Sequence, residues 1–451
     1  MTEPSTRPTW RVVALVGRVD GPEILVREGI DSPTLPTADQ PIEVEPFDAD
    51  AVAVIAALMG VPIVPIRLTW LPDEGWKSGT IVVEAEPLEV APAGTRWLDP
   101  TEVIESHEPV EARSVVRRRV QRRGAPPPRK EPPYARAGWF VRASAWMVER
   151  MADAGLPVTE SPRLAYQGPM GAVLRASSDG QATYLKWPTL AFPHEAAITH
   201  TLSRRARGAV PSVLAAERAQ NWLLMHDHGG RPVEDEPPRR WLDGLRHHAA
   251  LQRASIEWAD EIPAVGGQRR SLERLAAAIP TMLDYEDLGG RFAPEVRQAW
   301  VAGVPALVDA CAALDDAGLP DTVVHGDLHP GNIVVTPEDR YVVVDWSDAA
   351  LGNPFVDLAT YLTRTKDRDL RVRLLDAYVD VWDGFVDRAR LDAAADLAMT
   401  VGCLYQVQTY QALDAALDEP DRAIFTGSDA GWAKRALDFL EQGLDAGLSE
   451  R

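Results

Sequence analysis

The sequence predicts an α+β protein whose strands gather in the first half of the chain and whose helices gather in the second. Short runs of β-branched and apolar residues recur up to about residue 225. From residue 242 onward, apolar residues recur three and four positions apart, which is the spacing of amphipathic helices. The helices expected there are residues 242–261, 270–283, 294–317, 370–389, 392–416 and 429–447.

Residues 10–104 indicate an α+β unit of their own, within a predicted domain at residues 1–110. A helix at residues 49–59 is expected in the middle of this unit, and a short helix is expected after Pro100. The strands expected there are residues 11–16, 24–26, 66–70 and 80–85.

Residues 111–137 differ in composition from both neighbours and predict a linker rich in arginine and proline. Arg117–Arg119 and Arg122–Arg123 precede Pro126–Pro128 and Pro132–Pro133. Proline density of this kind favours an extended, semi-rigid spacer. The arginines are typical either of a solvated helix end or of contact with nucleic acid or phosphate, and we favour the solvated helix end.

The overall composition excludes several classes of protein. A hydrophobic content of 45% and a charged content of 25% are typical of a soluble globular protein, and the net charge of −20 disfavours a nucleic-acid partner. Cys311 and Cys403 are too few for a disulfide framework. The apolar run at residues 51–66 is short and broken by glycine and proline, so we expect no membrane span. No targeting segment is expected either, and we predict a cytoplasmic protein.

Residues 138–228 predict a helix at residues 142–154 followed by a small sheet. Gly168 and Gly171 lie in the turn between the first two strands, where backbone N–H groups can cover phosphates. An ordinary β-turn is the alternative, because it has the same sequence pattern. The strands expected in this domain are residues 163–167, 172–176, 182–187, 210–214 and 221–225.

Lys186 ends an apolar strand, and Glu195 begins a helix nine residues later. A lysine on a strand that pairs with a glutamate on the next helix orients the phosphates of a nucleotide. An exposed lysine at a strand end is the alternative. We favour the pairing because of a second motif further along the chain.

That second motif lies in residues 322–346, where Asp327 is followed by Asn332 and then by Asp345. Strands are expected at residues 322–324, 333–335 and 341–344, so that Asp345 follows a strand. An aspartate, an asparagine five residues later and a second aspartate after a hairpin is the pattern of phosphotransferase active sites. The first aspartate reaches the substrate hydroxyl, and the other two residues hold Mg²⁺ on the ATP phosphates. A metal site formed by His325, Asp327 and His329 is an alternative, but it leaves Asn332 and Asp345 unexplained.

The loop resembles that of the aminoglycoside phosphotransferase and choline kinase-like family, which reads His-Gly-Asp-X-His-X-X-Asn. Residues 325–332 match every specified position, and Asp348, Gly352–Pro354 and Asp357–Ala359 resemble the stretch that follows the family's second aspartate. The resemblance covers about residues 140–445. Trp346 and Ser347 stand where protein kinases have Phe-Gly, which argues against a protein kinase.

This resemblance implies a two-lobed protein-kinase-like fold, with a small β-sheet N-lobe at residues 138–228 and a helical C-lobe at residues 229–451. ATP would lie between the lobes, and Met225 and His226 would meet its adenine. By the same resemblance, Asp327 is the catalytic base. The resemblance further implies that Asn332 and Asp345 are the Mg²⁺ ligands and that Asp357 is a structural anchor.

A pocket for the phosphate acceptor is predicted after the catalytic hairpin and on the late helices. Its candidate residues are Asp348, Tyr405, Gln408, Tyr410 and Trp432. Acidic and aromatic groups can hold an amine by charge and by cation–π contact. Ordinary core packing is the alternative for the helical members of this set.

The order of elements in residues 10–104 resembles a Nudix hydrolase domain. When the family signature is aligned on Gly60, its paired carboxylates fall on Ala57 and Leu58, and Glu45 is the one acid that remains. Hydrolysis of a diphosphate needs carboxylates that bind metal. A Nudix-like domain here is therefore expected to be degenerate and inactive as a hydrolase.

The function predicted from these observations is transfer of the ATP γ-phosphoryl group, with Mg²⁺, to a hydroxyl of a small molecule. An aminoglycoside, an amino sugar or an amino alcohol is compatible with the predicted pocket. A non-catalytic kinase-like protein that senses a nucleotide or another ligand is the alternative.

Overall fold

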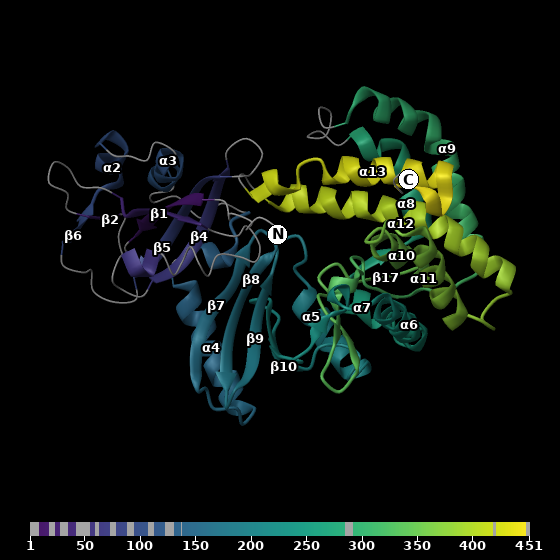
Figure 1. Ribbon diagram of the computed structural model, residues 1–451, viewed down its shortest axis with the longest axis horizontal. Coiled ribbons are helices and arrows are strands. Elements are labelled where there is room, and N and C mark those ends of the chain that lie inside the picture. Colours follow the sequence, from purple (N-terminus) through teal and green to yellow (C-terminus); the bar gives the residue numbers. More distant parts are fainter. Residues whose placement is uncertain are drawn as a thin grey trace, which may run out of the picture. The chain divides into compact units, whose positions relative to one another are not determined.

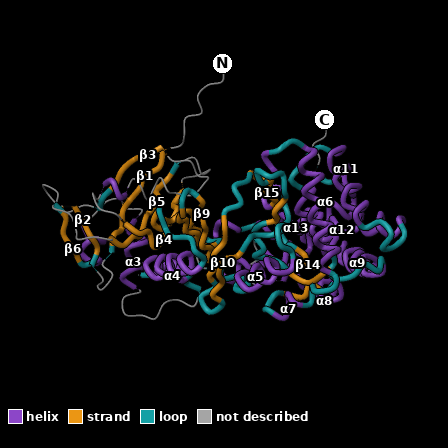
Figure 2. The backbone as a smooth tube through the Cα atoms, turned by 90° about the horizontal axis from the view of Figure 1, so that it is seen from below, coloured by secondary structure: helices purple, strands orange, loops and turns teal. Residues whose placement is uncertain are grey.

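The computed structural model describes most of the chain from residue 138 onward and shorter segments before it (Figure 1). The described residues are 9–17, 23–27, 35–41, 55–58, 63–72, 78–87, 94–106, 112–121, 130–136, 138–284, 292–417 and 421–447. By its internal contacts the chain divides into two compact units. One comprises residues 1–190 and 417–421, and the other comprises residues 191–416 and 422–451. Strands dominate the first unit and helices the second, which agrees with the predicted α+β class (Figure 2).

The first unit contains a four-stranded sheet in the order β3-β1-β5-β4 and a separate two-stranded ladder, β2-β6. β1 runs parallel to β5, and the other pairs are antiparallel. The predicted strands 11–16, 24–26, 66–70 and 80–85 are confirmed within longer strands, whereas β3 and β6 were not expected. The strands span Thr9–Val16 (β1), Ile24–Arg27 (β2), Thr37–Pro41 (β3), Ile63–Pro72 (β4), Gly79–Pro87 (β5) and Thr95–Leu98 (β6).

Both faces of the four-stranded sheet are covered, which explains why residues 12–16 form an unbroken apolar run. Trp10, Val12 and Ala14 pack in one buried cluster, and Val13 and Leu15 pack in another on the opposite face. Of the predicted helix at residues 49–59, residues 55–58 are helical and the rest lie outside the described residues. Gly60 and Glu45 also lie outside them, so the Nudix resemblance stays a prediction.

The predicted linker at residues 111–137 is not an extended spacer throughout, which corrects the sequence-based expectation. Arg113–Gln121 forms helix α3, which packs with α2 (Pro100–Ser106) on the sheet face that carries Val13 (Figure 1). Val115 and Val116 are the apolar residues that anchor α3, since both are buried in that cluster. In the sequence this pair of valines lies within an arginine-rich run, so a buried helix was not expected there. Arg122, Arg123 and the first proline run lie outside the described residues.

The remaining described part of the first unit includes the 3-10 helix η2 (Pro133–Ala135), helix α4 (Trp139–Asp153) and an antiparallel meander of three strands. The strands are β7 (Glu160–Gly168), β8 (Gly171–Ser178) and β9 (Gln181–Pro188), as predicted. Trp139, Ala143, Met147 and Met151 are the buried residues of α4. They recur every four positions and therefore form one apolar stripe.

The second unit begins with α5 (Glu195–Arg205) and the hairpin β10-β11 (Val213–Glu217 and Trp222–His226), and it is helical for most of its remaining length. The helix α12 is central, because it packs against α9, α10 and α13 in one large apolar core. The helices are α6 (Pro238–Ser255), α7 (Glu261–Ala264), α8 (Leu272–Ala278), α9 (Pro294–Asp316), α10 (Leu358–Leu362), α11 (Arg368–Val381), α12 (Arg388–Ala416) and α13 (Ser428–Gln442).

Two small sheets lie among these helices. One has the order β12-β15-β16 and contains the predicted hairpin; the other has the order β13-β17-β14. β12, β13 and β17 were not expected. In particular, residues 268–270 form β13 where the predicted helix 270–283 was to begin. The strands are β12 (Arg231–Pro232), β13 (Gln268–Arg270), β14 (Thr322–Val324), β15 (Ile333–Val335), β16 (Tyr341–Val343) and β17 (Ala350–Gly352).

Candidate active site

The loop between β14 and β15 carries Asp327 and is held by a buried carboxylate. Asp357 accepts a hydrogen bond from the backbone N–H of His325 and another from that of Gly326, each at 2.9 Å. Two N–H groups of the loop are thereby paired with a negative charge inside the protein. Charge-assisted bonds of this kind are stronger than neutral ones and fix the direction of the chain. The loop therefore leaves β14 in a defined orientation.

The same carboxylate is satisfied from its other side by helix α6. His248 Nε2 lies 2.9 Å from Asp357 Oδ2, and Gln252 Nε2 donates to the same oxygen at 3.0 Å. Burial alone would raise the pKa of Asp357, but the hydrogen bonds from His248 and His325 outweigh burial and lower it. Asp357 thus stays ionised and supports the loop, as the family resemblance implies for a structural anchor.

Gly326 allows the loop to turn sharply in front of Asp348. Its φ is +86°, and a Cβ atom at this position would lie 2.3 Å from the backbone oxygen of Asp348. A larger residue would meet both backbone strain and a steric clash here. The turn therefore requires glycine, which explains the His-Gly-Asp pattern physically.

His325 is fully buried and acts within the loop rather than toward solvent. Its Nε2 lies 2.9 Å from the carbonyl oxygen of Val344, and its Nδ1 accepts from the N–H of Asp327 at 3.3 Å. This pattern assigns a neutral ring protonated on Nε2. Burial lowers the pKa of His325, which agrees with a neutral ring. Both ring nitrogens are engaged, so the alternative metal site formed by His325, Asp327 and His329 gains no support.

Asn332 is brought directly to Asp327. Its Nδ2 donates to the backbone oxygen of Asp327 at 2.9 Å, and its own backbone oxygen accepts from Val344 N–H at 2.9 Å. The first bond commits the amide nitrogen, so Oδ1 is the atom that remains for a metal ion. Asp345 follows Val344 with a φ of +61°, a conformation that aspartate tolerates better than most residues. The hairpin and the loop are thereby tied together at the predicted site.

Asn332 and Asp345 supply an amide oxygen and a carboxylate, which are ligands that suit Mg²⁺. Magnesium usually takes one or two such groups and completes its shell with water and substrate phosphates. Within the described ranges, no group of three or more His, Cys, Asp or Glu side chains is arranged as metal ligands. The donor set thus fits a metal ion shared with a phosphate substrate rather than a closed protein cage.

Asp327 has an unusual acidity for a carboxyl group. Burial, together with the charges of Asp345 and Asp348, raises its pKa to about 6, whereas Arg364 opposes the shift. These interactions indicate that Asp345 and Arg364 lie near Asp327. A carboxylate of raised basicity is suited to accept a proton from a hydroxyl group near neutral pH.

Two of the predicted acceptor-binding residues, Asp348 and Tyr405, are engaged in an internal cluster instead. Asp348 Oδ1 pairs with Arg270 at 2.6 Å, and its Oδ2 accepts from Thr409 at 2.8 Å. The hydroxyl of Tyr405 donates to the backbone oxygen of Arg270 at 2.9 Å, and the guanidinium lies 5.3 Å from the centre of its ring. All four residues are buried. A structural role therefore accounts for Asp348 and Tyr405 better than contact with an acceptor.

Tyr410 and Trp432 lie together close to the loop. Burial raises the pKa of Tyr410, the charge of Asp327 adds to this shift, and a hydrogen bond with Trp432 opposes it. The guanidinium of Arg435 lies 4.6 Å from the centre of the Trp432 ring. Gln408 is partly exposed on the same helix as Tyr410, and its contact with an acceptor stays a prediction.

Sequence reasoning missed Arg270, Gln406 and Thr409. Gln406 donates to the backbone oxygen of Gly326, and Thr409, three residues later on α12, accepts from Arg270. Both residues are buried and therefore need partners. The same helix also carries Gln408 and Gln411, so its sequence did not single out Gln406 and Thr409. Arg270 offered no signal either, because its partners come from distant parts of the sequence.

The predicted nucleotide-binding residues fall in both units. Gly168 and Gly171 form the β7-β8 turn and Lys186 lies in β9, all in the first unit. The second unit contains the others: Glu195, the buried first residue of α5, and Met225 and His226 at the end of β11. The Lys186–Glu195 pairing and the adenine contacts stay predictions.

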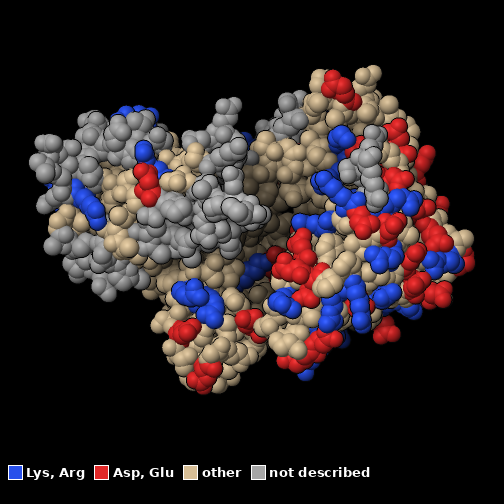
Figure 3. Space-filling view, viewed as in Figure 1, with Lys and Arg blue, Asp and Glu red and all other residues tan. Residues whose placement is uncertain are grey.

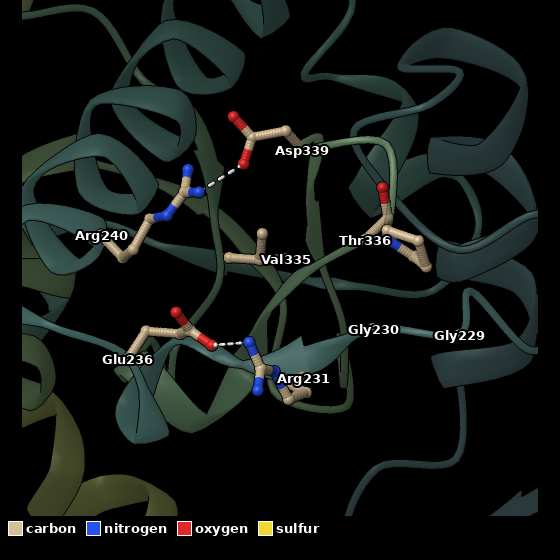
Figure 4. A pocket seen from close by; sticks show the side chains of 9 residues that line it. Gly229, Gly230, Arg231, Glu236, Arg240, Val335, Thr336 and Asp339 are labelled. Carbon is tan, nitrogen blue, oxygen red and sulfur yellow. Dashed lines mark ion pairs between the residues drawn. The ribbon is translucent and has the colours of Figure 1, made fainter.

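A separate cavity of about 370 Å³ lies beside the β15-β16 turn in the second unit (Figure 4). Its charged groups are paired, with Arg231 bonded to Glu236 at 2.8 Å and Arg240 bonded to Asp339 at 2.6 Å. Asp327, Asn332 and Asp345 are not among its lining residues. On the face shown in Figure 3, acidic and basic side chains are interspersed over the described part of the second unit.

Comparison with known proteins identifies the class of domain. Residues 172–394 match the model of a phosphotransferase enzyme family, so the chain contains a phosphotransferase-family domain. This range includes the β14-β15 loop, the hairpin and Asp357. A comparison with curated protein sequences finds no match.

Several solved structures are similar to this chain. A type I macrolide 2'-phosphotransferase is 19% identical, with 63% of this chain and 95% of that one covered and a TM-score of 0.46. The choline kinase LicA from Streptococcus pneumoniae is 13% identical, with coverages of 66% and 99% and a TM-score of 0.43. A spectinomycin phosphotransferase solved with ADP and spectinomycin is 11% identical, with coverages of 66% and 97% and a TM-score of 0.42.

Among the described residues, no helix has both the length and the apolar character needed to cross a membrane.

Proposed function

We propose that this protein is a small-molecule kinase that transfers the γ-phosphoryl group of ATP, with Mg²⁺, to a hydroxyl group. The observation that carries this proposal is the bond from Asn332 to the backbone of Asp327, on a loop anchored by Asp357. It joins a predicted base and a predicted metal ligand in one rigid element. The phosphotransferase-family domain at residues 172–394 supports the same reaction class.

In this mechanism the protein acts mainly by positioning and by electrostatics. Mg²⁺-ATP supplies the transferable phosphoryl group, and the metal neutralises charge on the phosphate oxygens. Asn332 Oδ1 and the Asp345 carboxylate would hold the metal. Asp327 accepts the proton of the acceptor hydroxyl, and its position is set by Asn332 and by the anchored loop.

The acceptor proposed is a hydroxyl-bearing small molecule of the aminoglycoside, amino-sugar or amino-alcohol type. Tyr410 supports this class, because an aromatic ring near Asp327 can contact a cationic amine. Asp348 is not available for that role, since Arg270 already neutralises it. Trp432 carries less weight for this role, because its ring is already in contact with the Arg435 guanidinium.

The test is ADP release with Mg²⁺-ATP across a panel of aminoglycosides, amino sugars, amino alcohols and nucleosides. Asp327→Asn should remove most turnover while nucleotide binding is retained. Asp339→Asn is the matched control, because Asp339 lies in the exposed turn of the neighbouring hairpin with a φ of +63° that asparagine also tolerates. Undiminished turnover in Asp327→Asn would refute the assignment. Nucleotide binding with no turnover on any acceptor would favour a ligand-sensing protein.

A further inference from the structure

The first unit contains both the predicted domain at residues 1–110, here called the N-terminal domain, and the β7-β8 turn that we expect to cover the ATP phosphates. Gly168 and Gly171 pair at the end of the β7-β8 hairpin. Gly171 has a φ of +137°, and a Cβ atom there would lie 2.3 Å from the backbone oxygen of Trp187. The turn is therefore closely packed against the strand that carries Lys186.

Tyr134, which precedes the kinase-like part of the chain, contacts this turn directly. Its hydroxyl donates to the backbone oxygen of Gly168 at 2.7 Å, and the side chain is buried. The Tyr134 ring packs edge-on against Trp187, with 5.4 Å between ring centres, and against Trp139 at 6.3 Å. Tyr134 thus contacts both the turn and the residue after Lys186.

The N-terminal domain holds the same hairpin through its strand β4. The buried side chain of Gln167 donates from Nε2 to the backbone oxygen of Ile66 at 2.8 Å. The next residue of β4, Arg67, is also buried and pairs with Asp421 at 3.1 Å. Burial raises the pKa of Tyr134, and the charges of Asp421 and Arg67 act on it in opposite directions, which indicates that both lie near the phenol.

A third connection lies where α4 begins. The backbone N–H of Gly138 donates to both carboxylate oxygens of Glu86, at 3.1 and 3.2 Å. Glu86 is a buried residue of β5, the central neighbour of β4. The segment that carries Tyr134 is therefore fastened to the N-terminal sheet on one side and to the glycine turn on the other.

From these contacts we propose that Tyr134 is a positioning residue for the phosphate-covering turn, and that the N-terminal domain is its support. This inference rests on the proposed function. A glycine turn has few side-chain contacts of its own, so its position depends on the groups that bond its backbone. The bond from Tyr134 to Gly168 holds the turn in a single position before the nucleotide binds. Preorganisation of this kind improves affinity because less freedom is lost on binding.

The experiment compares Mg²⁺-ATP binding, measured by calorimetry on the full chain, with the KM for ATP and with kcat. Tyr134→Phe removes only the hydroxyl, and Gln167→Met removes the donor to β4 with little change in size. Each should weaken ATP binding and raise the KM for ATP by ~3- to 10-fold, the loss of about one hydrogen bond, with kcat nearly unchanged. Tyr184→Phe is the matched control, since it removes a hydroxyl from β9 of the same sheet without touching the turn.

The outcomes separate this inference from the proposed function. Wild-type nucleotide affinity in Tyr134→Phe and Gln167→Met would overturn the inference and leave the kinase assignment intact. A lower melting temperature without a change in affinity would also overturn it, because a merely structural role predicts that result. A wild-type protein that binds no Mg²⁺-ATP would refute both proposals. Binding weakened in both variants but not in Tyr184→Phe supports the inference, whether or not an acceptor has been found.

Discussion

The side-chain Nδ2 of Asn332 donates to the backbone oxygen of Asp327 over 2.9 Å, which closes the candidate catalytic loop on itself. The predicted base and a predicted metal ligand therefore cannot move independently. Asp357 anchors the start of the loop through hydrogen bonds to its backbone. A substitution at Asp357 or Asn332 should therefore also alter the position of Asp327.

Replacement of Asn332 by Ala should weaken the response to Mg²⁺ and lower turnover together. The change removes the amide oxygen proposed as a metal ligand and also the bond to Asp327. Loss of a group that holds or orients a ligand typically costs about 10- to 100-fold in metal affinity. The Mg²⁺ concentration for half-maximal ADP release should rise by about this factor. An unchanged Mg²⁺ dependence would contradict the proposed role of Asn332.

Replacement of Asp357 by Ala should destabilise the second unit rather than alter one catalytic step. His248, Gln252 and the N–H groups of the loop would lose their shared acceptor inside the protein. Unpaired buried polar groups cost ~1–3 kcal/mol each, although relaxation and water reduce the sum. We expect the free energy of unfolding, measured with urea, to fall by about 2–4 kcal/mol. A fall below about 0.5 kcal/mol would show that the loop is held by other contacts.

The pair Arg270–Asp348 should show strong coupling in stability. Arg270→Met leaves the Asp348 carboxylate buried without its cation, for which about 3–5 kcal/mol is typical. In the double variant Arg270→Met, Asp348→Leu, no uncompensated charge remains, so much of that loss should be recovered. A double-mutant cycle by urea denaturation measures this coupling directly. Strictly additive effects would contradict an internal ion pair.

Stability should fall as the pH is lowered below about 6.5. In the folded protein the pKa of six histidines is lowered, chiefly by burial: His200, His226, His228, His247, His325 and His329. The unfolded chain therefore binds more protons in this range, and stability rises with pH up to the unfolded pKa.

Each such histidine contributes a slope of at most about 1.4 kcal/mol per pH unit. Melting temperatures between pH 5 and pH 8 test this prediction. His325→Gln, which removes one fully buried ring, should give a shallower dependence than the wild type. A stability that is flat over this range would contradict the prediction, because it would show that the folded and unfolded states bind the same number of protons.

Local sequence was enough to predict most of the regular elements. Strands β1, β5 and β7 to β9 and the long helices follow from apolar periods that extend over five or more residues. The pattern of residues 325–332 and Asp345 likewise depends on spacing within one loop and one hairpin. These elements and this motif can be predicted from the sequence because the residues that form them are close together in the chain.

The tertiary structure decided which of the candidate residues meet. Arg270 reaches Asp348 because β13 pairs with β17 at the register Arg270–Gly352, and these two strands lie 82 residues apart in the sequence. That contact gives Asp348, a predicted acceptor-binding residue, a partner inside the protein. The bond from Tyr134 to Gly168 depends in the same way on packing between segments that are far apart in sequence.

The sequence alone therefore determined the chemistry that the loop can offer, through the identity and spacing of Asp327, Asn332 and Asp345. Only the tertiary structure decided which polar groups are already satisfied inside the protein and which residues bond the β7-β8 hairpin from outside it. The physical reason is that a buried charge must find its partner in space. That partner is set by how distant elements pack, which short-range patterns do not encode.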